Sequence, residues 1–225
     1  MATTSIPRTY TTPGAHLRAL LWISRVQARV MKYFRERRHR WLAEEFGDCQ
    51  TVIDIGGRES MWQTVNLSPR VTLVNPEAGK AERAGFRCVE GDGRRLDFTD
   101  GWFDLAFANS VIEHVGTLED QRQFAREMMR VGGRIYCQTP NRWFPVEFHY
   151  LGVLVHWLPR SCFTYRVHRY FTLRGVLGKP NREQSLELRS SIRLLSRREL
   201  RKLFPGCRIR AERVLGWPKS YIVWR

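Results

Sequence analysis

"TVIDIGGRES", residues 51–60, joins a short apolar run to a pair of glycines. The run, residues 51–55, carries a single acid, Asp54, and breaks at Gly56 and Gly57. An apolar run of this length that ends in glycine is typical of a buried strand passing into a cofactor-binding turn. A dinucleotide-binding turn would continue as G-x-G-x-x-G, whereas Arg, Glu and Ser follow here. The stretch therefore predicts a strand and a close turn, and it argues against a nicotinamide enzyme.

Strand-like and helix-like segments alternate on either side of this stretch. Further strands are predicted at residues 71–75, 86–90, 103–108 and 134–139, and helices at 78–84 and 118–130. Short apolar strands that alternate with helices predict a parallel sheet covered on both faces. The fold class is therefore α/β, with a doubly wound sheet.

The end of the chain adds a helix and a hairpin. A helix is predicted at residues 196–203, where Ser196 is the N-cap candidate and Glu199, three residues on, completes a capping-box pattern. Two further strands are predicted at 208–214 and 220–224. They predict an antiparallel hairpin at one edge of the sheet.

The chain is predicted to be one domain across residues 1–225. Its parts are a loose arm at 1–14, a basic helical segment at 15–46, a cofactor-binding half at 47–140, an acceptor-side insertion at 141–195, and the helix and hairpin at 196–225. The longest apolar stretches are about half the roughly 20 residues that a bilayer span needs. The five cysteines form no C-x-x-C pair, which predicts reduced thiols and a cytoplasmic protein.

Basic residues gather in the two flanks of the chain. The formal net charge is +16, of which residues 1–45 contribute +6, residues 46–130 contribute −4 and residues 131–225 contribute +14. Such flanks predict an anionic partner: an acidic substrate, a membrane surface or nucleic acid. The alternative is a genome-wide bias toward arginine. The helical segment 15–46 could accordingly lie on anionic lipid or pack on its own domain.

Polar residues and glycines stand at the ends of four successive predicted strands. Because ligands bind beyond the carboxyl ends of parallel strands, these residues are candidates for one site. They are Asp54, Gly56 and Gly57 after the first strand, Asn75 after the second, Asp92 and Gly93 after the third, and Asn109 and Ser110 after the fourth.

Four stretches in this order resemble the class I S-adenosylmethionine-dependent methyltransferases, type 11 branch. They are "VIDIGG", "GDGRRLDF", "FDLAFANSVIEHV" and "RVGGRIYCQTPNRWFP". The resemblance covers residues 50–145 well and the C-terminal hairpin more loosely. It implies a Rossmann-like sheet of seven strands with an antiparallel last strand, S-adenosyl-L-methionine as the cofactor, and methyl transfer as the activity.

The resemblance also implies roles for the strand-end residues. Asp54 matches the acid that orients the amino end of the methionine moiety, and Gly56 and Gly57 match the turn where the backbone passes close to the cofactor. The other matches are Asp92, which accepts a hydrogen bond from the adenine amino group with Gly93 beside it, and Asn109 and Ser110, which line the floor near the sulfonium.

The sequence departs from the family pattern at two places. The first motif of the family usually contains three glycines. In this chain Arg58 and Ser60 occupy the second and third of these positions. The family acid that clamps the ribose hydroxyls is Asn75 here, which can accept and donate hydrogen bonds without a charge; Glu77 is a substitute candidate. Arg58 could pair with the methionine carboxylate or be a solvated turn charge. These departures leave open a weakened or lost cofactor site.

His114 is the predicted catalytic base, because an unperturbed imidazole titrates near neutrality. Its neighbour Glu113 is the second catalytic candidate. Adjacent residues on a helix diverge by about 100°, so only one of the two need face the site. The alternative for His114 is a helix-start histidine bonded to backbone.

Aromatic residues crowd residues 141–180, which follow the fifth predicted strand. This segment predicts an aromatic lid over a ring-bearing acceptor, or else plain packing against the sheet. His149, His156 and His168 also lie here, but no H-x-x-x-H spacing or paired acid supports a metal site, and none is predicted.

The predicted function is therefore methyl transfer from S-adenosylmethionine to a small-molecule, lipid or saccharide acceptor, which the basic flanks predict to be anionic. Peripheral contact with a membrane is compatible with the same flanks. The alternatives are a nucleic-acid methyltransferase, against which strand four ends in "ANSV" rather than an Asn-Pro-Pro-Tyr type pattern, and an inactive scaffold that binds a partner or membrane. The acceptor and the oligomeric state are not fixed by the sequence.

Overall fold

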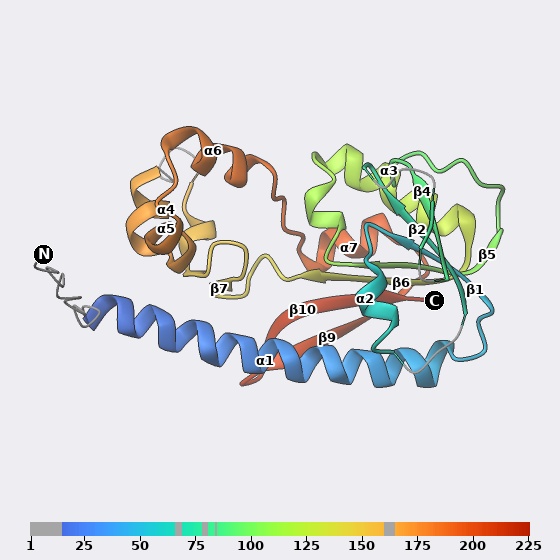
Figure 1. The fold of residues 1–225 in the computed structure, drawn as a ribbon, viewed down its shortest axis with the longest axis horizontal. Coiled ribbons are helices and arrows are strands. Elements are labelled where there is room, and N and C mark those ends of the chain that lie inside the picture. Colours follow the sequence, from blue (N-terminus) through green and yellow to red (C-terminus); the bar gives the residue numbers. More distant parts are fainter. Residues whose placement is uncertain (1–14, 66–68, 78–80, 84, 160–164) are drawn as a thin grey trace, which may run out of the picture.

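A computed structural model describes residues 15–65, 69–77, 81–83, 85–159 and 165–225. Its centre is a sheet of eight strands (Figure 1). In spatial order the strands are β3 (Ala81–Arg83), β4 (Phe86–Glu90), β2 (Arg70–Asn75), β1 (Thr51–Ile55), β5 (Phe103–Asn109), β6 (Gly132–Pro140), β10 (Trp217–Trp224) and β9 (Arg208–Val214). The arm predicted at residues 1–14 lies outside the described residues.

The pairing of the strands confirms the predicted α/β class. β4, β2, β1, β5 and β6 pair in parallel, and β10 pairs antiparallel with both β6 and β9. The seven strands predicted from the sequence are all present, with the last hairpin at one edge. Leu215 and Gly216 join β9 to β10 with positive φ values of 49° and 81°, as a tight two-residue hairpin turn requires.

The helix predicted at residues 78–84 is wrong where the structure describes that segment. Residues 81–83 form β3, the eighth strand, which pairs antiparallel with β4. Gly85 lies between the two strands with φ of +82°, a left-handed conformation that favours glycine. Pairing with an existing sheet edge therefore overrides a helical pattern that is only seven residues long. Residues 78–80 and 84 lie outside the described residues.

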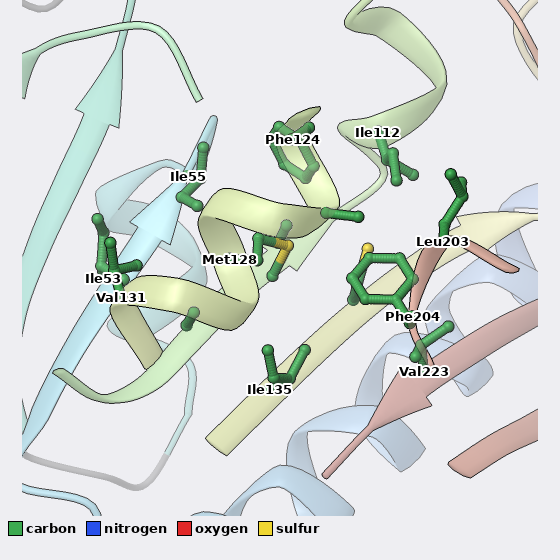
Figure 2. Packing of buried hydrophobic residues seen from close by; sticks show 14 of the residues in the cluster. Ile53, Ile55, Ile112, Phe124, Met128, Val131, Ile135, Leu203, Phe204 and Val223 are labelled. Atoms are coloured by element: carbon green, nitrogen blue, oxygen red, sulfur yellow. The ribbon is translucent and has the colours of Figure 1, made fainter. Parts of the chain in front are cut away.

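Helices cover both faces of the sheet (Figure 1). On one face α1 (Ala15–Phe46) and α2 (Glu59–Trp62) pack over β1, β5 and β6. On the other face lie α3 (Leu118–Val131) and α7 (Arg197–Leu203). Figure 2 shows Phe124, Met128 and Val131 of α3 packed among the isoleucines of β1 and β6 and Phe204 after α7. Each cluster buries apolar area, the main source of stability.

Side-chain caps begin α3 and α7. Thr117 and Asp120 form a reciprocal capping box at α3, and Ser196 and Glu199 form the capping box predicted for α7. Each cap satisfies backbone N–H groups that a helix start leaves without partners, which is typically worth about 1 kcal/mol.

Helix α1 packs its C-terminal half on the domain. Phe34, Leu42 and Phe46 are buried, and the buried Arg38 donates a 2.9 Å hydrogen bond to Glu212 of β9. Further toward the N-terminus Trp22 is exposed, and this half of the helix runs past the sheet, where α1 contacts α5 (Figure 1). Among the described helices, α1 included, none has a stretch long and apolar enough to span a bilayer.

The segment after β6 forms a group of short elements beside the sheet (Figure 1). They are the hairpin β7 (Val146–Glu147) and β8 (Gly152–Val153), the 3₁₀ helix η2 (Val155–Trp157), and helices α4 (Tyr165–Phe171), α5 (Leu173–Gly178) and α6 (Arg182–Ser190). They share a small core of Tyr150, Val155 and Ile192. Another 3₁₀ helix, η1 (Ile112–His114), follows β5.

Candidate active site

A pocket of about 780 Å³ opens between α1 and the carboxyl ends of β1 and β5. This volume lies in the range typical of small-molecule sites. Five of the eight residues that the sequence predicted for the cofactor line the pocket. They are Asp54, Gly56, Gly57, Asn109 and Ser110.

Asp54 is the buried acid of this pocket. Trp62 of α2 donates its indole N–H to Oδ2 at 2.7 Å, while Oδ1 is buried and has no hydrogen-bond partner among the described residues. Burial raises the pKa of Asp54 to about 7, and the hydrogen bond from Trp62 opposes this rise. A buried carboxylate oxygen without a donor is costly, so the site is suited to a cationic group such as an ammonium.

The glycine pair lets the chain pass close to this acid. A Cβ on Gly57 would lie 1.8 Å from the Asp54 carboxylate. Gly56 has φ of +76°, and a Cβ there would lie 2.8 Å from Val111. Asn75 donates its side-chain N–H to the carbonyl of Gly57 at 3.0 Å. The turn therefore needs only two glycines, because α2 begins at Glu59 and Asn75 secures the backbone.

The other three predicted cofactor residues lie outside the lining of this pocket. Asn75 holds the turn, and the Asp92 carboxylate accepts hydrogen bonds from Arg94, which also pairs with Asp120. These bonds from Arg94 lower the pKa of Asp92. A Cβ on Gly93 would lie 2.7 Å from Ile55 and Phe124, so packing alone accounts for this glycine. The adenine role of Asp92 and Gly93 stays a prediction.

Helix α1 supplies a wall of the pocket that the sequence analysis did not predict. Arg35, Arg38, His39 and Leu42 line it. Their spacing of three, four and seven residues places them on one face of a helix, which is the sequence signal that could have identified them. Arg58 from the turn after β1 lines the pocket as well and is exposed. Glu36 is the one acid in this outer part and Arg38 is paired with Glu212, so Arg35 and Arg58 give it a net positive charge, opposite to that of Asp54.

Glu113 and His114 do not line this pocket. They lie in η1, at the same carboxyl edge of the sheet. Glu113 is fully buried, and its Oε2 accepts a 2.9 Å hydrogen bond from Thr139 of β6. The Nε2 atoms of His114 and His149 are 3.1 Å apart. Burial raises the pKa of Glu113 to about 7 and lowers the pKa of His114. The catalytic role of the pair stays a prediction.

The other predicted histidines separate in the fold. His156 lies beside the backbone carbonyl of Arg142 at 3.1 Å, and His168 lies 3.0 Å from the hydroxyl of Ser185. A second pocket, of about 400 Å³, opens near His156. Its lining includes two tryptophans and three arginines, namely Trp143, Trp157, Arg142, Arg189 and Arg193. No described residue of the predicted lid, residues 141–180, lines the first pocket, so the lid role stays a prediction.

Solved structures share this fold at low sequence identity. A Rhodobacter sphaeroides protein provisionally named as a Zn-dependent alcohol dehydrogenase is 16% identical, over 84% of this chain and 87% of that chain, with a TM-score of 0.53. A chain in the complex between the Haloferax volcanii Trm112 methyltransferase activator and a methyltransferase is 11% identical, over 91% and 93%, with a TM-score of 0.52. The PH0226 protein of Pyrococcus horikoshii OT3 is 17% identical, over 86% and 89%, with a TM-score of 0.52.

These similarities show the fold, and because the names of the neighbours differ, the fold alone does not decide the activity. No curated protein sequence is significantly similar to this chain. Residues 54–137 match the family model of the type 11 methyltransferase domain. This range begins at Asp54 and includes the η1 segment. Residues 54–137 therefore form a methyltransferase domain, as the sequence motifs predicted, and S-adenosylmethionine is the cofactor that this domain implies.

Proposed function

We propose that this enzyme transfers the methyl group of S-adenosylmethionine to a small anionic acceptor: a small molecule, a lipid headgroup or a saccharide. The observation that carries the proposal is the unpaired Oδ1 of Asp54 on the wall of a pocket whose outer part is basic. A ligand with an ammonium group at one end and negative charge nearby matches this distribution of charge.

The residues of the pocket fit the amino-acid end of the cofactor. Asp54 would hold its ammonium, and Arg58 would pair with its carboxylate. Bound S-adenosylmethionine supplies a methyl group that the neighbouring sulfonium makes electrophilic. The chain contributes mainly position and exclusion of water, because the leaving thioether is neutral and needs no proton. Asn109 and Ser110 would form the floor, where the hydroxyl of Ser110 is held by a 2.8 Å hydrogen bond to Gln138.

Arg35 and His39 of α1 would face the acceptor. His39 lines the pocket, and burial together with the neighbouring Arg38 and Arg35 lowers its pKa, so its ring is neutral at pH 7 and can accept a proton. His39 therefore competes for the role of catalytic base with the two residues predicted from the sequence, His114 and Glu113. Replacing each histidine with glutamine separates the two: the base is the one whose loss lowers kcat without weakening cofactor binding.

Transfer of a labelled methyl group tests the acceptor class. Purified enzyme and labelled S-adenosylmethionine are incubated with separate lipid, water-soluble and RNA fractions of a cell extract. Label in the lipid or water-soluble fraction, absent with Asp54→Asn, supports the proposal. Label only in RNA supports a nucleic-acid methyltransferase instead. A place in the cytoplasm, with or without contact to a membrane surface, is a further expectation from the basic flanks.

A further inference from the structure

Two histidine rings from distant parts of the chain face each other at the edge of the sheet. The Nε2 atom of His114, in η1, lies 3.1 Å from the Nε2 atom of His149, in the loop between β7 and β8. The opposite nitrogen of His149, Nδ1, lies 2.5 Å from the Glu147 carboxylate. Glu147 is itself buried and accepts a 2.8 Å hydrogen bond from the backbone N–H of Tyr150. His149 is therefore held in a fixed orientation.

The anchoring bonds decide which ring nitrogens carry protons. A carboxylate only accepts, so His149 donates from Nδ1, and a neutral ring then has a lone pair on Nε2. His114 faces this atom with its own Nε2, and the tautomers of the two rings decide which nitrogen donates. A single cation between the two Nε2 atoms, either a proton or a metal ion, would satisfy the lone pairs of both.

Glu113 adds a third donor atom to this place. Its Oε1 is buried and has no hydrogen-bond partner among the described residues, while Thr139 holds its Oε2. Single donor atoms of Glu113, His114 and His149 all lie within 4.8 Å of one another. Three potential ligand atoms therefore converge, and the two ring nitrogens among them are otherwise bonded to each other.

The charges around the cluster are also unbalanced. Glu113 and Glu147 are both buried. Within the described segments, the one ion pair that these two acids make is between Glu147 and His149. The ring of His149 is charged only when it is protonated. Ionising both carboxylates beside one imidazole is unfavourable, and one divalent cation would neutralise both.

We propose that Glu113, His114 and His149 bind one divalent transition-metal ion, with Zn²⁺ as the best match. Two nitrogens bound to Zn²⁺ at tetrahedral angles lie about 3.3 Å apart, close to the separation of the two Nε2 atoms. Two histidines and one glutamate leave a fourth position open to water or a ligand. Glu147 would serve as the outer carboxylate that orients a metal-bound histidine, and Thr139 as the outer partner of Glu113.

The site would fasten residues 141–195 to the sheet. Glu113 and His114 directly follow β5, whereas His149 belongs to the segment after β6, 35 residues further along the chain. A spacing search misses such a site because its ligands come from different elements. His114 is exposed, so an ion can enter from solvent. The inference does not depend on the acceptor, and a metal-bound His114 would leave His39 as the catalytic base.

Metal binding by the whole chain tests the proposal. Protein treated with a chelator is titrated with Zn²⁺ by calorimetry, and with Co²⁺, whose visible absorption is intense in tetrahedral sites. We expect one equivalent to bind and the midpoint of thermal unfolding to rise on addition of Zn²⁺. His149→Gln and Glu113→Gln should lower the affinity at least a hundredfold, and Glu147→Gln about 10- to 100-fold.

His156→Gln is the matched control, because His156 lies in the same segment but outside the cluster, and its binding should equal that of the wild type. Glu113→Gln preserves the shape and can keep the bond to Thr139, so it separates loss of a ligand from loss of fold. Wild-type protein that binds no stoichiometric ion would overturn the proposal and would indicate a proton shared by the two rings. Binding that survives both His149→Gln and Glu113→Gln would overturn it equally.

Discussion

Trp62 and Asp54 are joined by a 2.7 Å hydrogen bond that holds the buried acid by one oxygen and leaves the other available. The donor is an indole on α2, eight residues after the acid. The turn at Gly56 and Gly57 therefore brings α2 back against the end of β1, where Asp54 lies. The bond fixes the direction of the carboxylate before any ligand arrives. Binding then costs little side-chain entropy, which is an advantage of a preorganised site.

The affinity for S-adenosylmethionine should rise with pH through neutrality. Burial raises the pKa of Asp54 to about 7, and only the ionised carboxylate pairs with an ammonium. The ionised fraction grows about fivefold between pH 6 and pH 7, so Kd should fall by about that factor. Calorimetry at the two pH values measures it. In Asp54→Asn the binding should be weaker and should lack this dependence; an equal slope in the variant would refute the role of Asp54.

Gly57→Ala should damage the cofactor pocket more than its size suggests. The new Cβ would lie 1.8 Å from the Asp54 carboxylate, so either the turn or the acid must move. We expect the affinity for S-adenosylmethionine to fall about tenfold or more, with a loss of about 1–3 kcal/mol in the free energy of unfolding. Gly178→Ala on α5 is the control, since a Cβ there meets nothing within 4 Å. Equal effects of the two substitutions would contradict the close approach.

Asp92→Ala and Arg94→Gln together test the predicted adenine contact. If Asp92 accepts a hydrogen bond from the adenine amino group, its loss should weaken cofactor binding about tenfold. Arg94→Gln releases the carboxylate from a partly exposed ion pair, so it should change the stability by no more than about 1 kcal/mol and should keep the affinity or improve it. Calorimetry and denaturant unfolding measure both. If Asp92→Ala binds S-adenosylmethionine as tightly as the wild type does, Asp92 has no contact with adenine and serves only to pair with Arg94.

Glu212→Gln should loosen α1 from the sheet. Glu212 accepts a 2.9 Å hydrogen bond from Arg38 and lies 3.4 Å from the ammonium of Lys219, and all three residues are buried. Removing the one negative charge leaves two buried cations together, at a cost of about 3 kcal/mol in the free energy of unfolding. Denaturant unfolding measures the change. The exposed Glu187→Gln should stay within about 0.5 kcal/mol of wild type.

Proteolysis tests whether residues 141–180 close over the cofactor. No described residue of this segment lines the first pocket, so a lid role requires it to move. Trypsin cleavage after arginines in the segment should slow when S-adenosylhomocysteine is bound, whereas cleavage after Arg213 in the C-terminal hairpin should keep its rate. Equal rates in the segment with and without the ligand would argue against closure.

The strands, the α/β class and the helix starts could be predicted from the sequence because their signals are local. The strand at 51–55 is marked by its own apolar run and by Gly56. The α7 capping box joins residues three apart, Ser196 and Glu199. Both signals can be recognised within a few residues of chain, although the hydrogen bonds of the strand itself are made with β2 and β5.

Tertiary contacts decided what the local pattern could not. Residues 81–83 became a strand only because β4 offered a free edge to pair with. Asp92 matches a family acid, yet its carboxylate is paired with Arg94. The same arginine also pairs with Asp120 on α3. The sequence shows which groups are present, and packing determines which of them meet.

The two candidate sites show the same division. Asp54, Gly56 and Gly57 could be identified from one short stretch, whereas the basic wall of their pocket comes from α1, which docks through the distant pair of Arg38 and Glu212. His114 and His149 are 35 residues apart and meet only because the chain after β6 folds back toward η1. Bringing such groups together costs chain entropy that only the burial of the whole core can offset.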